Sequence, residues 1–196
     1  MLHELSLWDK SVSLAINGAN SPAADEFFYW VSDKFVWIPI YAFLLFLIFK
    51  KGGLRGGFAA VIFIALLILC VDQSCTWFFK RTVERLRPCH DGTIAHLVHL
   101  VKGHCGGRYG FLSAHSANFF ALATFTSLLF RRRYYAVAAV SVAVLTGYSR
   151  IYLGVHFLGD VVCGAIWGLL LGTAIYYFFE KFCYKILKYQ PYNGGF

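Results

Sequence analysis

Charged residues are scarce in this chain of 196 residues, where they make up 14% while hydrophobic residues make up 59%. A soluble domain normally carries about a quarter charged residues, so the shortage favours an integral membrane protein. Acidic residues are fewer than basic ones, ten against eighteen, which leaves a formal net charge of +8. The basic residues lie in loops between apolar runs, so we expect membrane anchoring and an anionic substrate rather than nucleic acid.

Further absences narrow the organisation of the chain. The first 25 residues contain neither a basic region nor an apolar core, so no cleavable signal peptide is expected. No repeat, low-complexity tract or domain linker interrupts the chain, which predicts a single domain over residues 1–196. Six cysteines are too few to form a disulfide scaffold in a chain of this length.

Five apolar runs approach the length of a membrane span. They cover residues 35–49, 57–79, 112–130, 134–148 and 157–179. Residues 4–17 have mixed polarity, with apolar residues at helical spacing, and indicate an interfacial amphipathic helix or a short first element. We therefore predict an all-α fold, a polytopic membrane helix bundle with about five to six transmembrane helices and an N-terminal interfacial helix.

Five spans place the N-terminus, the 80–111 loop and the 149–156 turn on one side of the membrane. The other side receives the 50–56 loop, the 131–133 turn and the C-terminus. Each side carries nine lysine and arginine residues, so the positive-inside rule gives a tie. Setting aside the cations that are candidates for substrate contacts favours the second side as cytoplasmic.

Three polar clusters interrupt the apolar sequence, and all three fall on the first side. The first contains Lys80, Arg87 and Pro88. If the helix of the second span continues beyond the membrane, Lys80 and Arg87 are two turns apart and share one face, and Pro88 then ends the helix. The alternative is a basic collar at the end of a span, which is common in membrane proteins.

The second cluster, Ser113, Ala114 and His115, opens the third span. Free backbone N–H groups and the positive dipole end make the first turn of a helix a binding site for phosphate. Ser113 could cap this helix and donate to an anion, and His115 could transfer protons at neutral pH. The alternative is a plain helix cap beside an interfacial histidine.

The third cluster contains Arg150, His156 and Asp160. On a helix, the spacing of four would stack Asp160 beneath His156, so that the carboxylate orients the imidazole as a nucleophile or base. Arg150 would add a planar fork suited to phosphoryl oxygens. The alternative is a structural His–Asp pair beside a cationic loop, but three such alternatives would have to coincide on one face.

Together these motifs closely resemble the three-part signature of the type 2 phosphatidic acid phosphatase (PAP2) superfamily. The first and third motifs match fully, whereas the second reads Leu112-Ser113-Ala114-His115 where the family usually has Pro-Ser-Gly-His. The flanking helices are similar to those of the small bacterial members. The resemblance implies metal-independent hydrolysis of a phosphomonoester or diphosphate, without a cofactor.

By the same resemblance, His156 attacks phosphorus to form a phosphohistidine, Asp160 orients it, and His115 protonates the leaving oxygen and then activates water. Lys80, Arg87, Arg150, Ser113 and the Ala114 amide hold the phosphoryl oxygens. Family members act on lipid phosphates at the exoplasmic face, which here implies the bacterial inner membrane with the site facing the periplasm. Membrane lipids are the other expected partners, and the oligomeric state stays open.

The substrate stays open as well. Family substrates include undecaprenyl diphosphate, lipid A phosphates, phosphatidylglycerol phosphate and phosphatidic acid, and the similarity to small bacterial members favours the first two. A lipid phosphotransferase of the same superfamily is one alternative. A transporter or binding protein is another, but it would place polar residues through several spans, and only Asp72 and Gln73 lie deep. For Asp72 we expect a buried hydrogen-bond partner.

The 89–110 loop between the first two motifs carries four histidines between Cys89 and Cys105. A disulfide, two free thiols and a metal site are all possible. The spacings match no compact zinc pattern, and an oxidising compartment favours a disulfide. We therefore name Cys89 and Cys105 as a disulfide candidate and expect no metal.

Overall fold

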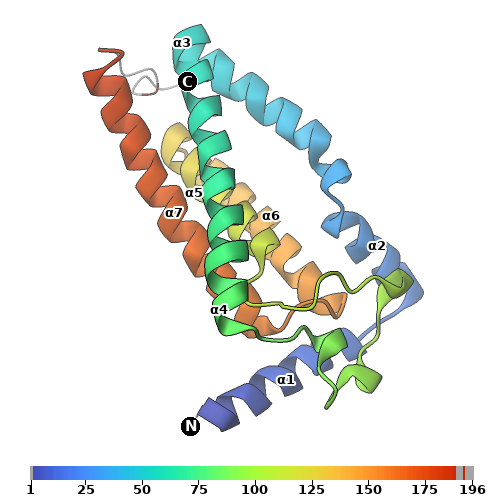
Figure 1. The fold of residues 1–196 in the computed structure, drawn as a ribbon. Coiled ribbons are helices and arrows are strands. Elements are labelled where there is room, and N and C mark those ends of the chain that lie inside the picture. Colours follow the sequence, from blue (N-terminus) through green and yellow to red (C-terminus); the bar gives the residue numbers. More distant parts are fainter. Residues whose placement is uncertain (1, 189–191, 193–196) are drawn as a thin grey trace.

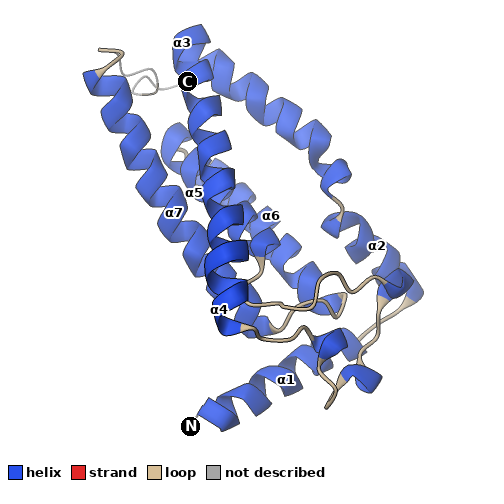
Figure 2. Ribbon diagram, in the orientation of Figure 1, coloured by secondary structure: helices blue, strands red, loops and turns tan. Residues whose placement is uncertain are grey.

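The structure is a computed structural model that describes residues 2–188 and 192. Within these residues the secondary structure is helical, apart from an isolated bridge between Leu86 and Tyr109 (Figures 1 and 2). The long helices are α1 (Leu2–Gly18), α2 (Pro22–Ser32), α3 (Ile38–Gln73), α5 (Ala114–Phe130), α6 (Arg133–Tyr152) and α7 (Leu158–Lys185). Short helical segments are η1 (Lys34–Trp37), η2 (Ser74–Lys80), α4 (Arg81–Val83), η3 (Pro88–His90), η4 (Ala95–Leu97) and η5 (Val101–Gly103). The all-α prediction is confirmed.

Helix α3 contains most of the first two apolar runs and reverses its direction between them. The reversal is at Gly53, whose φ of 61° and ψ of −170° lie in a region that only glycine adopts readily. From this turn the two arms of α3 diverge toward the other end of the bundle (Figure 1). The predicted loop at 50–56 is therefore a turn within one nearly continuous helical segment.

The bundle has the dimensions and surface of a membrane protein. Among the described residues, two segments are long and apolar enough to cross a bilayer, Lys34–Val83 and Leu158–Lys185. Because the first of them reverses at Gly53, its two arms, together with α5, α6 and α7, correspond to the five predicted runs. Large apolar side chains such as Phe43, Phe46 and Ile62 are exposed, as expected where lipid surrounds the protein.

Helices α5 and α7 form the tightly packed centre of the bundle. Gly164, Gly168 and Gly172 lie along the contact, where a Cβ atom would overlap the backbone oxygens of Ser113, Ala117 and Ala121. Small residues at this spacing let two helices approach closely within a membrane. Further along the two helices, Phe125, Leu129 and Phe179 are buried and fill the core. The close approach fixes the start of α7 against the start of α5.

The chain alternates as predicted between the two ends of the bundle. The turn at Gly53, the connection between α5 and α6, and the end of α7 lie at one end (Figure 1). Helix α1, the long loop after α4 and the connection between α6 and α7 lie at the other. All three polar clusters are therefore at the same end.

Two local predictions about these clusters are wrong. The second arm of α3 does not continue to Arg87, because the helix ends at Val83 and Glu84 adopts a left-handed conformation with φ of 50°. Arg87 is extended and begins the long loop. His156 likewise precedes α7 instead of lying on it, since Phe157 is the N-cap and the helix begins at Leu158. In both places a connection, not a helix, presents the side chain.

Candidate active site

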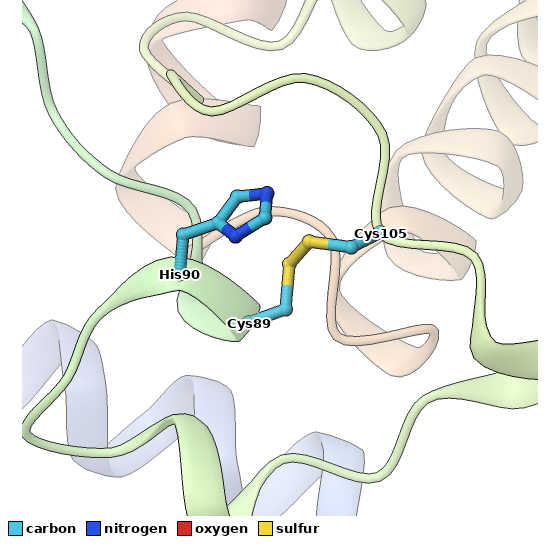
Figure 3. Close-up of side chains that lie close together, drawn as sticks. All are labelled: Cys89, His90 and Cys105. Atoms are coloured by element: carbon cyan, nitrogen blue, oxygen red, sulfur yellow. A yellow bond between two sulfur atoms is a disulfide. The ribbon is translucent and has the colours of Figure 1, made fainter.

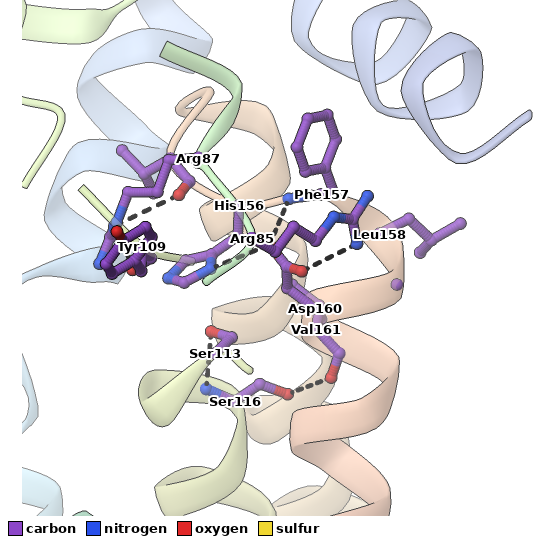
Figure 4. Close-up of polar contacts among 12 residues, drawn as sticks. Arg85, Arg87, Tyr109, Ser113, Ser116, His156, Phe157, Leu158, Asp160 and Val161 are labelled. Atoms are coloured by element: carbon purple, nitrogen blue, oxygen red, sulfur yellow. Dashed lines mark hydrogen bonds and ion pairs between the residues drawn. The ribbon is translucent and has the colours of Figure 1, made fainter. Parts of the chain in front are cut away.

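Asp160 is the centre of a buried polar network at the start of α7. Its side chain is fully buried. Oδ2 accepts a hydrogen bond from the backbone N–H of Phe157 at 3.1 Å, and Oδ1 accepts one from Nη1 of Arg85 at 2.9 Å (Figure 4). A carboxylate that caps its own helix and binds an arginine has its two oxygens fixed. Asp160 is thus held rigidly, facing the turn before the helix.

His156 lies in that turn, and its Nδ1 is 3.4 Å from Oδ2 of Asp160 (Figure 4). This is an ion-pair distance without hydrogen-bond geometry. Burial holds the pKa of His156 well below its usual range, and the charges of Arg87, Arg150 and Lys80 act in the same direction. The imidazole is therefore neutral at pH 7. With Nδ1 toward the carboxylate, Nε2 is the nitrogen left for chemistry.

Arg87 is buried and is held by carbonyl groups. Nη1 donates to the backbone oxygens of Cys105 and Val155, both at 3.2 Å, and Nε donates to the oxygen of Tyr109 at 3.4 Å. Arg150 donates from Nη1 to Ser32 Oγ, and its buried Nε has no hydrogen-bond partner in the part of the chain that the structure describes. The backbone N–H groups of Val155 and His156 bond to the Arg150 oxygen, so this turn folds over Arg150.

None of the ion pairs among the described residues involves Lys80, Arg87 or Arg150. All three charges nevertheless act on the imidazole of His156, so the first and third motifs come together in space. Clustered cations without carboxylate partners repel each other. An arrangement of this kind becomes favourable when an anion such as a phosphoryl group binds between them.

The second motif is at the start of α5, as predicted. Ser113 is the N-cap, and its Oγ accepts a hydrogen bond from the N–H of Ser116 at 3.4 Å. Its own N–H donates to the backbone oxygen of Asp160 at 3.0 Å, which joins the starts of α5 and α7. Ala114 is the first residue of the helix, and His115 is exposed beside it.

Two cavities meet at His115. A polar one of about 310 Å³ is lined by residues that include His104, His115 and Arg150. An apolar groove of about 600 Å³ lies between the two arms of α3 and α5, and it shares Ser32, Lys34 and His115 with the polar cavity. His156 does not line the polar cavity, but its neighbour Val155 does. The arrangement suits a lipid with an anionic head group.

Helix α1 contributes functional residues that the sequence analysis missed. Asp9 accepts from Nη2 of Arg85 at 2.6 Å and from the N–H of Gly159 at 2.9 Å. Ser13 accepts from the N–H of Leu158 at 2.9 Å. These contacts satisfy the first free N–H groups of α7. The signal was present as a polar stripe, because Asp9, Ser13 and Asn17 recur at spacings of four and are buried.

The long loop is closed by a disulfide between Cys89 and Cys105 (Figure 3). His90 lies beside it, with Nε2 at 3.4 Å from the oxygen of Gly106. These three side chains are close enough together to bind a metal ion. However, a sulfur atom in a disulfide is not a thiolate ligand, so His90 is the one remaining ligand of this group.

We expect mass spectrometry of the unreduced protein to detect the peptides of Cys89 and Cys105 linked to each other. Closing a loop of this length stabilises a protein by about 3 kcal/mol in the chain-entropy model. The double variant Cys89→Ala/Cys105→Ala should therefore unfold at a lower temperature, whereas Cys70→Ala, which removes a free cysteine, should change little. Free alkylation of both thiols in protein prepared without reductant would contradict the disulfide.

Comparison with known proteins gives consistent matches. Residues 59–183 match the model of the PAP2 superfamily. The chain is 38% identical over 195 residues to a lipid A 4′-phosphatase of Bacteroides thetaiotaomicron, with 99% of this chain and 87% of the relative covered. It is 39% identical over 169 residues to a lipid A 4′-phosphatase of Porphyromonas gingivalis, covering 86% and 71%.

The fold also resembles a solved structure. The crystal structure of a transmembrane PAP2-type phosphatidylglycerolphosphate phosphatase from Bacillus subtilis aligns with a TM-score of 0.68. The alignment covers 91% of this chain and 87% of the other, at 24% identity, so this likeness concerns the fold alone. The family match extends over the helices that carry all three motifs. The chain therefore belongs to the PAP2 superfamily and is a lipid phosphatase.

Proposed function

We propose that this protein removes the 4′-phosphate from a lipid A-type glycolipid, through a phosphohistidine intermediate on His156. The observation that carries the proposal is the meeting of the two cavities at His115. The polar cavity offers cations to a phosphate, and the apolar groove offers a place for acyl chains. The two lipid A 4′-phosphatases that match most of this chain support the choice of substrate.

In the first step, the lone pair of His156 Nε2 forms a bond to phosphorus as the bond from phosphorus to the sugar oxygen breaks. His115, which the bound phosphoryl anion helps to protonate, gives its proton to that oxygen, so the lipid leaves as an alcohol. Lys80, Arg87 and Arg150 stabilise the charge on the phosphoryl oxygens, with Ser113 and the Ala114 amide as further donors. Asp160 stabilises the positive charge that develops on His156.

In the second step, His115 accepts a proton from water as the water oxygen attacks phosphorus. The bond between phosphorus and Nε2 breaks, which releases inorganic phosphate and restores neutral His156. No metal ion is required, because the positive charges come from side chains. The phosphoryl group needs access to His156, which is 2% exposed behind the turn at Val155.

We propose further that the active site faces the periplasm from the bacterial inner membrane. The end of the bundle that carries the three motifs also carries the Cys89–Cys105 disulfide, and structural disulfides persist in oxidising compartments. The opposite end carries basic residues such as Lys50, Arg132 and Lys181, which lie outside the candidate site. This distribution agrees with the positive-inside rule.

The test is a phosphate-release assay on purified protein in the presence of EDTA. The panel contains lipid A, undecaprenyl diphosphate, phosphatidylglycerol phosphate and phosphatidic acid. We expect the highest kcat/KM with lipid A, and mass spectrometry should find the product dephosphorylated at the 4′ position. A preference for undecaprenyl diphosphate would contradict the substrate. Loss of activity in EDTA that zinc or magnesium restores would contradict the metal-independent mechanism.

A further inference from the structure

The apolar groove contains a pair of polar side chains that the proposed chemistry does not use. Asn118 on α5 donates from Nδ2 to Oδ1 of Asp72 on α3 at 2.8 Å. Both residues line the groove of about 600 Å³, whose other walls are mostly apolar side chains such as Leu45, Ile64 and Phe119. The pair joins the second arm of α3 to α5 across the floor of the groove.

This pair retains hydrogen-bonding capacity. Asp72 is exposed. Among the described residues, its carboxylate accepts one hydrogen bond, which comes from Asn118. The second side-chain oxygen, Oδ2, can accept another donor. Oδ1 of Asn118 is buried and has no partner within residues 2–188 and 192. An ionisable side chain at bilayer depth is costly and usually marks function, and a bond from one amide satisfies only part of a carboxylate.

The pair lies at a defined depth below the phosphate site. His115, Asn118, Phe119 and Leu122 line the groove at helical spacings. Asn118 follows His115 by three residues, which corresponds to a rise of about 4.5 Å along α5. A lipid whose phosphate is beside His115 would therefore bring to Asp72 the atoms that join its head group to its acyl chains.

We propose that Asp72 and Asn118 select a lipid phosphate that carries a hydrogen-bond donor at this junction. The donor is the N–H of an amide-linked acyl chain, or a hydroxyl group close to that linkage. The inference rests on the proposed phosphatase site and deepens it. An isoprenoid phosphate presents only hydrocarbon at this depth, and it would leave the carboxylate without a further partner, which is unfavourable.

The experiment uses the protein in lipid nanodiscs and three 4-phosphorylated sugar lipids with equal chain lengths. Two are glucosamine 4-phosphates, one with an amide-linked 3-hydroxyacyl chain and the other with the amide but without the hydroxyl. The third is the matching glucose 4-phosphate, in which an ester replaces the amide. We expect kcat/KM to be about ten-fold or more higher for a lipid with the required donor than for the ester, as for a hydrogen bond to a charged group. The second lipid distinguishes the amide N–H from the hydroxyl.

Asp72→Leu should reduce the ratio of kcat/KM between the donor-bearing lipid and the ester lipid to about one. Asp72→Asn should retain part of this preference, because its carbonyl oxygen still accepts a hydrogen bond. The matched control is Gln73→Leu, which removes an exposed polar side chain at the same depth that does not line the groove. It should leave the ratio unchanged.

If the wild-type protein releases phosphate from all three lipids with nearly equal kcat/KM, the inference is overturned and the proposed function stands. Release from an isoprenoid diphosphate but from none of the three would overturn the proposed function itself. If Asp72→Leu does not fold, the three wild-type rates still decide, because they compare lipids on an unchanged protein.

Discussion

Replacing His156 with alanine is expected to reduce the rate of phosphate release by about 10⁴-fold or more, as for the loss of an activated nucleophile in other enzymes. The variant removes Nε2, the protein atom that we expect to bond to phosphorus. Because His156 is buried, the loss of its side chain leaves a cavity that should lower the free energy of unfolding, but the close packing of α5 against α7 is unchanged, so the variant should still fold. Thermal unfolding of the variant should check this.

Asp160→Asn provides the graded comparison. The nucleophile remains, but it loses the carboxylate that orients the ring and stabilises its positive charge, so we expect a smaller loss of activity than in His156→Ala. The control is His96→Ala, which removes an exposed histidine of the long loop and should retain wild-type activity. Quenching a reaction at alkaline pH should preserve a phosphohistidine on the peptide of His156.

Substantial activity in His156→Ala would contradict the mechanism. A phosphohistidine on the peptide of His115 would contradict it in a different way, by exchanging the roles of the two histidines. The geometry argues against that exchange, because Asp160 is 3.4 Å from His156, while His115 is exposed at the mouth of the two cavities. An acid that protonates the leaving lipid needs this exposed position.

The sequence predicted the arrangement of the bundle because long apolar runs and charged turns are local signals. The runs at 112–130 and 157–179 became α5 and α7 with small changes at their ends. Counting the spans also predicted that the three motifs lie at the same end of the bundle. Ser113 was recognised as an N-cap for the same reason, since its partner Ser116 is three residues away.

The positions of Arg87 and His156 could not be predicted, because contacts with distant residues determine them. Arg87 leaves the helix to reach the carbonyl oxygens of Cys105 and Val155, which are 18 and 68 residues away. Those contacts keep the loop extended where a helix was expected. The role of Arg85 was hidden for the same reason, because its two carboxylate partners are more than 70 residues distant.

Arg85→Leu is expected to destabilise the protein by about 3 kcal/mol, near the lower end of the range for breaking a buried ion pair. Arg85 binds Asp160 at 2.9 Å and Asp9 at 2.6 Å, and its guanidinium lies 4.2 Å from the ring centre of Phe157. The lower end applies because the Arg85 side chain is a quarter exposed. Without it, the carboxylates of Asp9 and Asp160 remain buried and lose the cation that they share.

The same variant should lower kcat more than it raises KM. Arg85 contacts Asp160 rather than the cavity, so it acts as a positioning residue for the carboxylate that orients His156. Arg85→Lys should restore part of the activity, because an ammonium group can still pair with one carboxylate at a time. The control is Arg81→Leu, which should retain nearly full kcat. Arg81 is exposed, precedes Arg85 by four residues and stacks on Trp77.

A double-mutant cycle separates the electrostatic cause from a loss of packing. If uncompensated charge causes the destabilisation, Arg85→Leu combined with Asp9→Leu should be more stable than the sum of the two single effects predicts, because the second change removes one of the stranded carboxylates. Additive effects in thermal unfolding would show that the charges are not coupled. An Arg85→Leu protein with wild-type stability and wild-type kcat would contradict the network altogether, and α1 would then be an anchor that does not support the active site.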